Sequence, residues 1–287
     1  MKTFRTIEAY HAFLREVRKT PTRTIGFVPT MGYLHAGHLS LVERAKREND
    51  VVAMSVFVNP LQFGPNEDFD RYPRNEARDL ELMEAAGVDA AFLPTVEEMY
   101  PRGTGKTTVS VAGVTERLCG AFRPGHFDGV ATVVAKLFHI IRPDRAYFGL
   151  KDAQQVAVIA TMAADLNFPI EIVPCPTLRE SDGLAMSSRN VYLTAEQRAR
   201  APVLYRSLQR IDEWLASEPG LTSSELEARL ADAIRETPGA TLDYAQVLAY
   251  PTLEPFDGPA AARDGRWIAA LAVKFGHTRL IDNRLFP

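Results

Sequence analysis

The chain has 287 residues, more than a single hydrophobic core usually supports, so two domains are expected. Hydrophobic residues make up 46% and charged residues 24%, proportions typical of globular proteins that exclude a disordered or fibrous class. The net charge of -3 provides no overall basic field, so neither nucleic acid nor an anionic membrane is an expected partner.

Cysteine usage and hydropathy indicate the compartment. Cys119 and Cys175 are too few for a disulfide framework or a zinc site. The first twenty residues lack the apolar core of a signal peptide, and no run approaches eighteen apolar residues. We therefore expect a cytoplasmic protein without a membrane span.

Short apolar runs alternate with helical patterns over the first 175 residues. The runs expected to form buried parallel strands are 24–30, 51–58, 90–94, 145–149 and 170–175. The helical patterns that separate them are 39–49, 75–87, 129–142 and 153–167. This alternation predicts an α/β fold with a Rossmann-like, doubly wound parallel sheet.

The pattern changes from about residue 194. Helical patterns at 194–217 and 222–237 each open on Thr with a nearby Glu, a signature of helix N-termini. Three β-like runs follow, at 242–250, 266–275 and 278–286. They predict a smaller α+β domain, and we place the two domains at residues 1–177 and 178–287.

The segment PTMGYLHAGH, residues 29–38, ends a strand and begins a helix. Gly32 and Gly37 permit close backbone approach to a ligand, and the i, i+3 spacing puts His35 and His38 on one side of the first helical turn. Backbone N–H groups at such a helix start attract anions, so a polyphosphate could bind there. The alternative is a simple turn with hydrogen-bonded histidines, but two histidines beside two glycines favour a functional site.

Two later segments carry polar groups suited to phosphate. GLKDAQQ, 149–155, follows a predicted strand, so Lys151 could reach a phosphate and Gln155 a hydroxyl or carboxylate. RESDGLAMSSRN, 179–190, offers serine hydroxyls and the planar cation of Arg189 on a loop that could close over a nucleotide. An ordinary helix cap and a charged surface turn are the respective alternatives.

Two further segments place polar residues beside predicted apolar elements. Asn59 and Gln62 lie at the carboxyl end of the strand 51–58, where a small polar substrate would bind. Arg123 and His126 lie among turn-forming residues. This segment, 119–130, is interpreted as either a mobile lid or a structural turn.

The segment RGTGKTT, residues 102–108, resembles a phosphate-binding loop. Such a loop requires glycine at the position of Tyr100, and no long apolar helix follows. We therefore predict a solvated loop or hairpin without a nucleotide role.

Together the stretches FVPTMGYLHAGH, VFVNPLQF, RPGHFDGV, GLKDAQQ and GLAMSSRN resemble the pantothenate synthetase (pantoate–β-alanine ligase) family of the nucleotidyltransferase superfamily. HAGH resembles the HxGH signature of that superfamily, and AMSSR resembles its KMSKS-type loop. Aminoacyl-tRNA synthetases and cytidylyltransferases share these two signatures, whereas NPLQF, GLKDAQQ and RPGHFDGV favour the single family.

The resemblance implies ATP-dependent condensation of (R)-pantoate with β-alanine through a pantoyl adenylate, with release of pyrophosphate and AMP and a requirement for Mg²⁺. It implies a homodimer. It also implies that residues 1–177 bind nucleotide and pantoate, and that residues 178–287 carry the closing MSSR loop. We expect the HAGH, GLKD and MSSR segments to converge on one crevice.

The same resemblance implies roles for individual residues. His38 would be a proton donor, Gln62 would hold pantoate and β-alanine, and Gln155 would hold pantoate. Asp79 would lie near the magnesium-bound phosphates, although Arg78 occupies a neighbouring position that can be acidic in the family. The groups expected to stabilise charge on the triphosphate are His35, His38, Lys151 and Arg189. The expected ATP contacts are Met31, Gly32, Tyr33, Leu34, His35, Ala36, Gly37, His38, Gly149, Leu150, Lys151, Asp152, Leu178, Met186, Ser187, Ser188 and Arg189.

Two competing functions stay open at this point. A nucleotidyltransferase of different specificity would keep the HAGH site and change the pocket near Gln62 and Gln155. A non-catalytic nucleotide sensor would bind ATP without turnover, but every proposed catalytic position is filled.

Overall fold

The computed structural model describes residues 1–65, 67–104 and 106–287. The chain divides into two compact units and passes between them several times. The first unit comprises Met1–Val111, Arg123–Leu150 and Val158–Pro176, and the second comprises Ala112–Phe122, Lys151–Ala157 and Thr177–Pro287. The assignment of nucleotide and pantoate binding to residues 1–177 stays a prediction.

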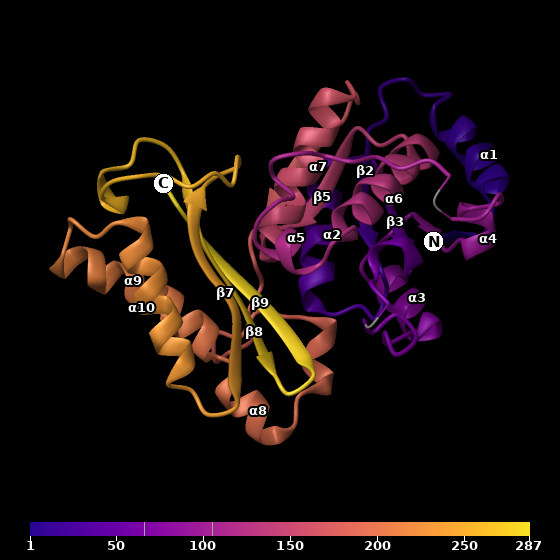
Figure 1. Ribbon diagram of the computed structural model, residues 1–287. Helices are drawn as coiled ribbons and strands as arrows, with labels where there is room; N and C mark the ends of the chain where they lie inside the picture. Colours follow the sequence, from indigo (N-terminus) through magenta and orange to yellow (C-terminus); the bar gives the residue numbers. More distant parts are fainter. Residues whose placement is uncertain (66, 105) are drawn as a thin grey trace. The chain divides into compact units, whose positions relative to one another are not determined.

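A six-stranded parallel sheet forms the centre of the first unit (Figure 1). Its strand order is β1-β4-β3-β2-β5-β6. The strands are β1 (Lys2–Phe4), β2 (Ile25–Thr30), β3 (Val51–Val56), β4 (Ala90–Phe92), β5 (Arg145–Gly149) and β6 (Glu171–Cys175). Because the strands are parallel, the segments after β2, β3 and β5 leave the sheet at the same edge.

Helices cover both faces of this sheet. Apolar residues of α2 and α3 pack on one face, in a cluster with Val28, Met54 and Tyr147. On the other face α1 places Tyr10 against Phe92, and α6 packs on β2 and α1. The helices are α1 (Ile7–Val17), α2 (Ala36–Glu48), α3 (Glu76–Ala85), α4 (Val96–Met99), α6 (His126–Ile141) and α7 (Ala153–Asp165), with short 3₁₀ turns η1 (Pro60–Gln62) and η2 (Leu150–Asp152).

The second unit is built on a three-stranded antiparallel sheet, in the order β7-β8-β9. Leucines of α9 and α10 form one apolar cluster with residues of β8, including Ala269 and Leu271. The elements are α5 (Cys119–Phe122), η3 (Ser188–Tyr192), α8 (Ala195–Arg200), α9 (Val203–Ser217), α10 (Ser223–Arg235), β7 (Ala240–Ala249), η4 (Ala260–Ala262), β8 (Trp267–Phe275) and β9 (Thr278–Phe286).

The predicted fold class is confirmed: a parallel α/β sheet and a smaller α+β part are both present. Two local expectations were wrong or incomplete. The pattern 194–217 is not one helix, because a break at Ala201 and Pro202 separates α8 from α9, and proline cannot donate the backbone hydrogen bond that a continuous helix needs there. The sheet also contains β1, which is too short to give a periodic signal and pairs with β4.

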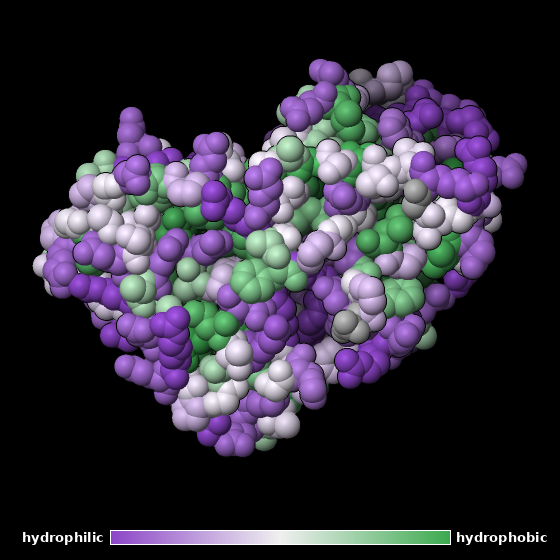
Figure 2. Space-filling model, viewed as in Figure 1, coloured by the Kyte–Doolittle hydropathy of each residue, from purple (hydrophilic) through white to green (hydrophobic). Residues whose placement is uncertain are grey.

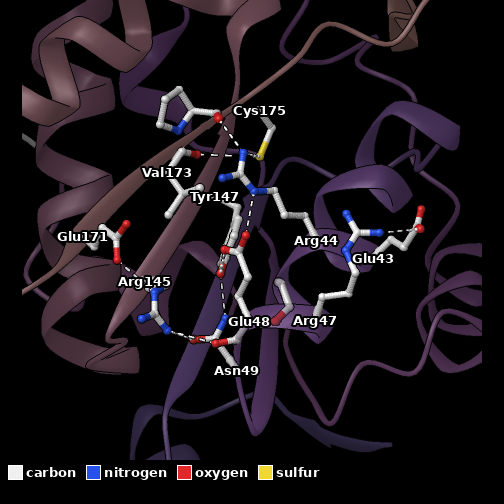
Figure 3. Close-up of polar contacts among 12 residues, drawn as sticks. Glu43, Arg44, Arg47, Glu48, Asn49, Arg145, Tyr147, Glu171, Val173 and Cys175 are labelled. Carbon is white, nitrogen blue, oxygen red and sulfur yellow. Dashed lines mark hydrogen bonds and ion pairs between the residues drawn. The ribbon is translucent and has the colours of Figure 1, made fainter.

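A polar network ties the C-terminal end of α2 to β5 and β6 (Figure 3). The hydroxyl of Tyr147 donates to Glu48 Oε2 at 2.8 Å and accepts from Asn49 Nδ2 at 2.7 Å. Arg44 donates to Glu48 Oε1 at 3.0 Å and to the carbonyl oxygen of Pro174 at 2.9 Å. The hydrogen bonds from Tyr147 and Arg44 hold the pKa of Glu48 below its usual range. These contacts fix the direction of α2 from its far end.

A membrane-spanning helix must be long and apolar. No helix among the described residues is both long enough and apolar enough to cross a bilayer. On the face seen in Figure 2, apolar residues form separate clusters among hydrophilic ones, and apolar atoms contribute a large share of most folded proteins' surfaces.

Replacing Tyr147 with Phe should lower the free energy of unfolding by about 1–2 kcal/mol, because Glu48 and Asn49 lose a buried partner. Burial, together with the bond to Glu48, raises the pKa of Tyr147 from 10.0 to about 12. The neutral phenol is therefore favoured in the folded state, and its contribution is lost as the pH rises through that range. Urea unfolding should show the difference between the two proteins shrinking from pH 10 to pH 12.

The matched control is Tyr205→Phe. Its hydroxyl accepts an exposed hydrogen bond from Gln209 at 2.8 Å, so its loss should change stability by less than about 0.5 kcal/mol. Equal effects of the two substitutions would contradict the role given to Tyr147.

Candidate active site

The loop between β2 and α2 contains the HAGH segment and has an unusual backbone. Gly32 has a φ of 85° and Tyr33 a φ of 51°, both in the left-handed region that favours glycine. A Cβ at Gly32 would lie 2.8 Å from Val56 Cγ1 and 2.9 Å from Asp79 Oδ2. Both conformation and space therefore require glycine at this position.

The carboxylate of Asp79 holds this loop. Its two oxygens accept hydrogen bonds from the backbone N–H groups of Tyr33 and Leu34, at 2.8 and 2.7 Å. Asp79 lies in the first turn of α3 and is only 1% exposed. The two charge-assisted bonds replace the water that this buried carboxylate has lost. Helix α3 thus anchors the start of α2.

Arg78 holds the opposite side of the same turn. Its Nη1 donates to the carbonyl oxygen of Leu34 at 2.9 Å, and its guanidinium lies 5.7 Å from the centre of the Tyr33 ring. Two adjacent residues of α3 therefore bind both the N–H and the C=O groups of the loop. This contact gives the departure from the family pattern at Arg78 a structural role.

The two histidines cap α2. His35 Nδ1 accepts from the backbone N–H of Gly37 at 3.1 Å, and His38 Nδ1 accepts from the backbone N–H of His35 at 3.3 Å. The rings lie 4.0 Å apart. A ring nitrogen that accepts carries no hydrogen, so each imidazole in this arrangement has its hydrogen on Nε2. Each histidine can therefore donate through Nε2 at the positive end of the helix.

Gln62 lies beside this loop. It is the last residue of η1 and is 9% exposed. Its Nε2 lies 3.0 Å from Met31 Sδ, and its Oε1 accepts from Asn59 Nδ2 at 3.3 Å. The structure thus brings Gln62 to the first residue of the loop that leads to His35.

Asn59 supports η1 from within. It is 1% exposed, and its Oδ1 accepts from Leu61 N at 3.3 Å and from the Tyr100 hydroxyl at 2.8 Å. Its Nδ2 also donates to the carbonyl oxygen of Gly129 at 3.0 Å. These contacts show Asn59 as a support for Gln62, and its direct contact with substrate stays a prediction.

Gly149 ends β5 in the first unit, and Leu150 comes next, in η2. Lys151 begins a segment of the second unit. Its backbone carbonyl accepts from Asn283 Nδ2 of β9 at 2.9 Å, and its Nζ lies 3.8 Å from Asp152 Oδ2. An ion pair this long holds the ammonium only weakly.

The MSSR segment is anchored within the second unit. Met186 N donates to the carbonyl oxygen of Leu178 at 3.0 Å, and Ser187 Oγ accepts from Arg189 N at 3.2 Å. Asn190 Nδ2 donates to Glu180 Oε1 at 2.9 Å. Strand β9, which contacts Lys151 through Asn283, also packs on η3. The GLKD and MSSR segments thus share β9 as a support.

The residues that the sequence predicts for the site are divided between the two units. Those of the first unit are Met31–His38, Asn59, Gln62, Asp79, Gly149 and Leu150, and those of the second are Lys151, Asp152, Gln155, Leu178 and Met186–Arg189. The sequence predicts a solvated loop or hairpin for the segment 102–108. Its described residues, 102–104 and 106–108, are exposed and outside helices and strands, while Gly105 lies outside the described residues.

The described side chains near this loop do not provide enough ligands to coordinate a metal ion by themselves. Among the described residues no group of three His, Cys, Asp or Glu side chains could hold a metal ion. Both oxygens of Asp79 already accept backbone N–H groups. Magnesium often binds through one or two carboxylates plus substrate phosphates, so these residues fit an ion carried mainly by a nucleotide.

Sequence reasoning missed several supporting residues, among them Tyr100, Asn283 and Arg78. Tyr100 binds Asn59, Asn283 binds the Lys151 backbone, and Arg78 binds Leu34. Each contact joins residues at least 41 positions apart in the chain. Of these three residues, only Arg78 could have been noticed in the sequence, because it departs from the family pattern next to Asp79.

Replacing Gly32 with Ala should lower the free energy of unfolding by about 1–2 kcal/mol through the left-handed backbone and by about 1–3 kcal/mol more through the contacts with Val56 and Asp79. The control is Gly103→Ala, at a φ of 81° with nothing within 4 Å of its Cβ. Both substitutions strain the backbone, but only the one at Gly32 adds close contacts. The difference between their free energies of unfolding, measured in urea, therefore gives the cost of those contacts. Equal losses would show that the close approach at Gly32 has no energetic effect.

Comparison with known proteins gives a consistent result. A family model described as pantoate-beta-alanine ligase matches residues 2–285. A pantothenate synthetase of Acetivibrio thermocellus is 55% identical over 283 residues, covering 99% of this chain and 98% of the relative. That of Pelotomaculum thermopropionicum is 56% identical over 284 residues, covering 98% and 97%.

Solved structures agree over the whole chain. A crystal structure of pantothenate synthetase from Thermus thermophilus has a TM-score of 0.90 at 50% identity and covers 99% of both chains. A pantoate-beta-alanine ligase from Francisella tularensis, described as complexed with beta-gamma ATP and beta-alanine, has a TM-score of 0.79 at 36% identity, covering 99% and 97%. The chain therefore belongs to the pantoate–β-alanine ligase (pantothenate synthetase) family.

Proposed function

We propose that this chain is an ATP-dependent ligase that joins (R)-pantoate to β-alanine, producing pantothenate, AMP and pyrophosphate. Family membership supports this reaction. The observation in this chain that carries the proposal is the 3.0 Å approach of Gln62 Nε2 to Met31 Sδ. The Gln62 amide, suited to holding pantoate, lies against the loop suited to binding ATP. Transfer of the adenylyl group to pantoate requires the two substrates to bind next to each other.

In the first step the pantoate carboxylate attacks the α-phosphorus of ATP. A carboxylate–phosphorus bond forms, the bond to the bridging oxygen breaks, and pyrophosphate leaves with the bonding electrons. Two anions must approach each other, so the barrier is largely electrostatic. Gln62 and Gln155 hold pantoate in this proposal, with Asn59 supporting Gln62.

His35 and His38 act on the developing charge. Their Nδ1 atoms are used in capping α2, so Nε2–H is the group that can donate to phosphate oxygens. The positive end of the α2 dipole adds to this attraction. His38 is the proposed proton donor.

Lys151 and Arg189 add full positive charges to the triphosphate. The long Lys151–Asp152 pair leaves the ammonium weakly held, which suits a cation that must bind phosphate. The remaining proposed ATP contacts are those expected from the sequence: Met31–His38, Gly149–Asp152, Leu178 and Met186–Arg189.

In the second step the amine of β-alanine attacks the acyl carbon of pantoyl adenylate. A carbon–nitrogen bond forms, AMP leaves with the electrons of the broken carbon–oxygen bond, and the nitrogen loses a proton. Binding the amine beside the adenylate removes much of the entropic barrier. No covalent enzyme intermediate is needed.

Magnesium enters this proposal with ATP. Bound to the phosphates, it would neutralise part of their charge. Asp79 lies near those phosphates through the loop that it anchors, and its two backbone hydrogen bonds make loop positioning its main role.

We further propose a cytoplasmic homodimer. The homodimer is inferred from the family resemblance. Both cysteines are free and buried, which suits a reducing compartment.

Replacing His38 or Lys151 with Ala should slow pantoate-dependent exchange of labelled pyrophosphate into ATP by about 100- to 1,000-fold, the usual effect of removing one preorganised donor. Exchange should require pantoate and proceed without β-alanine. Circular dichroism should show an unchanged fold.

Matched controls are His139→Ala, an exposed histidine of α6, and Lys19→Ala, an exposed lysine paired with Glu16. Both should exchange at the wild-type rate. Near-normal exchange by folded His38→Ala and Lys151→Ala proteins would refute their roles, and exchange driven by another acid instead of pantoate would favour a nucleotidyltransferase of different specificity.

A further inference from the structure

A second polar cluster surrounds the main chain of Gln62. The carbonyl oxygen of Gln62 lies 3.2 Å from Arg123 Nη2 and 2.8 Å from His126 Nδ1. Both residues come from the RPGH segment at the start of α6. The side chain of Gln62 contacts Met31 and Asn59 instead. The contacts to the carbonyl oxygen therefore position the main chain of Gln62 without occupying its side-chain amide.

The tautomer of His126 can be assigned from its neighbours. Arg123 Nη1 lies 3.0 Å from His126 Nε2, and a guanidinium can only donate. His126 Nε2 must therefore accept, so the hydrogen is on Nδ1 and is donated to the Gln62 carbonyl oxygen. The imidazole acts as a neutral link between Arg123 and Gln62.

Glu67 fixes Arg123 in turn. Arg123 Nε lies 2.6 Å from Glu67 Oε1, and Nη2 lies 2.5 Å from Oε2, in a two-pronged ion pair. Burial acts to raise the pKa of Glu67, but Arg123 outweighs it and holds that pKa below its usual range. The carboxylate is thus ionised at neutral pH, and the guanidinium is oriented before it meets Gln62.

The backbone of α6 closes the other side. A Cβ at Gly129 would lie 2.3 Å from the carbonyl oxygen of Leu61 and 2.6 Å from Gln62 N. Only glycine allows the helix to approach η1 this closely. The main chain at Gln62 is therefore held between the Arg123–His126 pair and Gly129.

We propose that Arg123 and His126, oriented by Glu67, are positioning residues that set the Gln62 amide for pantoate. The inference rests on the proposed role of Gln62 in binding pantoate and adds the residues that hold it in place. Of the two alternatives for Arg123 and His126, a mobile lid and a structural turn, these contacts favour the structural turn.

The test is steady-state kinetics of His126→Ala and His126→Asn. Alanine removes the donor to the Gln62 carbonyl oxygen, whereas the Asn amide nitrogen can occupy nearly the place of Nδ1. We expect Ala to raise KM for pantoate about 10- to 100-fold, with KM for ATP unchanged and the protein still folded by circular dichroism. Asn should restore KM for pantoate to within about threefold of wild type.

Ser110→Ala is the matched control. Ser110 donates to Asp128 in the first turn of α6 at 2.8 Å, a hydrogen bond to the same helix start that does not include Gln62. It should leave every kinetic constant unchanged. If Ser110→Ala raised KM for pantoate as much as His126→Ala, general loosening of α6 would explain the effect and the proposal would fail.

Gln62→Ala separates this inference from the proposed function. Loss of pantoate affinity in Gln62→Ala but not in His126→Ala would overturn the positioning role alone. Normal pantoate affinity in Gln62→Ala would overturn the role of Gln62 itself. Failure of His126→Asn to recover affinity would mean that the imidazole contacts substrate directly, which also contradicts the proposal.

Discussion

Two hydrogen bonds to one buried carboxylate hold the loop between β2 and α2 in place. Asp79 accepts the backbone N–H groups of Tyr33 and Leu34, in a loop whose backbone at Gly32 and Tyr33 is left-handed. Such a conformation costs roughly 1–3 kcal/mol at a residue other than glycine. Charge-assisted bonds of this kind contribute about 1.5–3 kcal/mol each. They are thus sufficient to keep the loop in this shape.

The shape of that loop determines where the neighbouring functional groups lie. The loop places His35 at the start of α2 and Met31 against Gln62. The other end of α2 is tied to β5 and β6 through Tyr147 and Arg44 (Figure 3). A helix fixed at both ends can present its N–H groups and two imidazoles without reorganising when charge develops. The same logic applies to Gln62, whose main chain is held while its amide faces the loop.

Much of the architecture could be predicted from the sequence because buried parallel strands are nearly continuous apolar runs, as β2 and β3 illustrate. The HAGH and MSSR segments could be proposed for the site because their residue types and spacing are local. The break at Pro202 was missed because apolar periodicity continues across it.

Supporting contacts could not be predicted in the same way. Asp79 meets N–H groups 45 and 46 positions away, and Arg123 meets Gln62 from 61 positions away. No local pattern encodes such pairs, because they arise only when the sheet brings separate segments together. Gly129 is similar: its need for glycine comes from η1 and not from its own helix.

The most direct measurement is the dissociation constant for ATP of Asp79→Asn, determined by calorimetry with magnesium and again with EDTA. Asparagine keeps one acceptor but turns an NH₂ group toward a backbone N–H, so the loop should lose its shape. If Asp79 acts by anchoring the loop, ATP binding weakens about tenfold or more under both conditions. Weakening with magnesium but unchanged affinity in EDTA would identify Asp79 as a metal ligand and contradict this account.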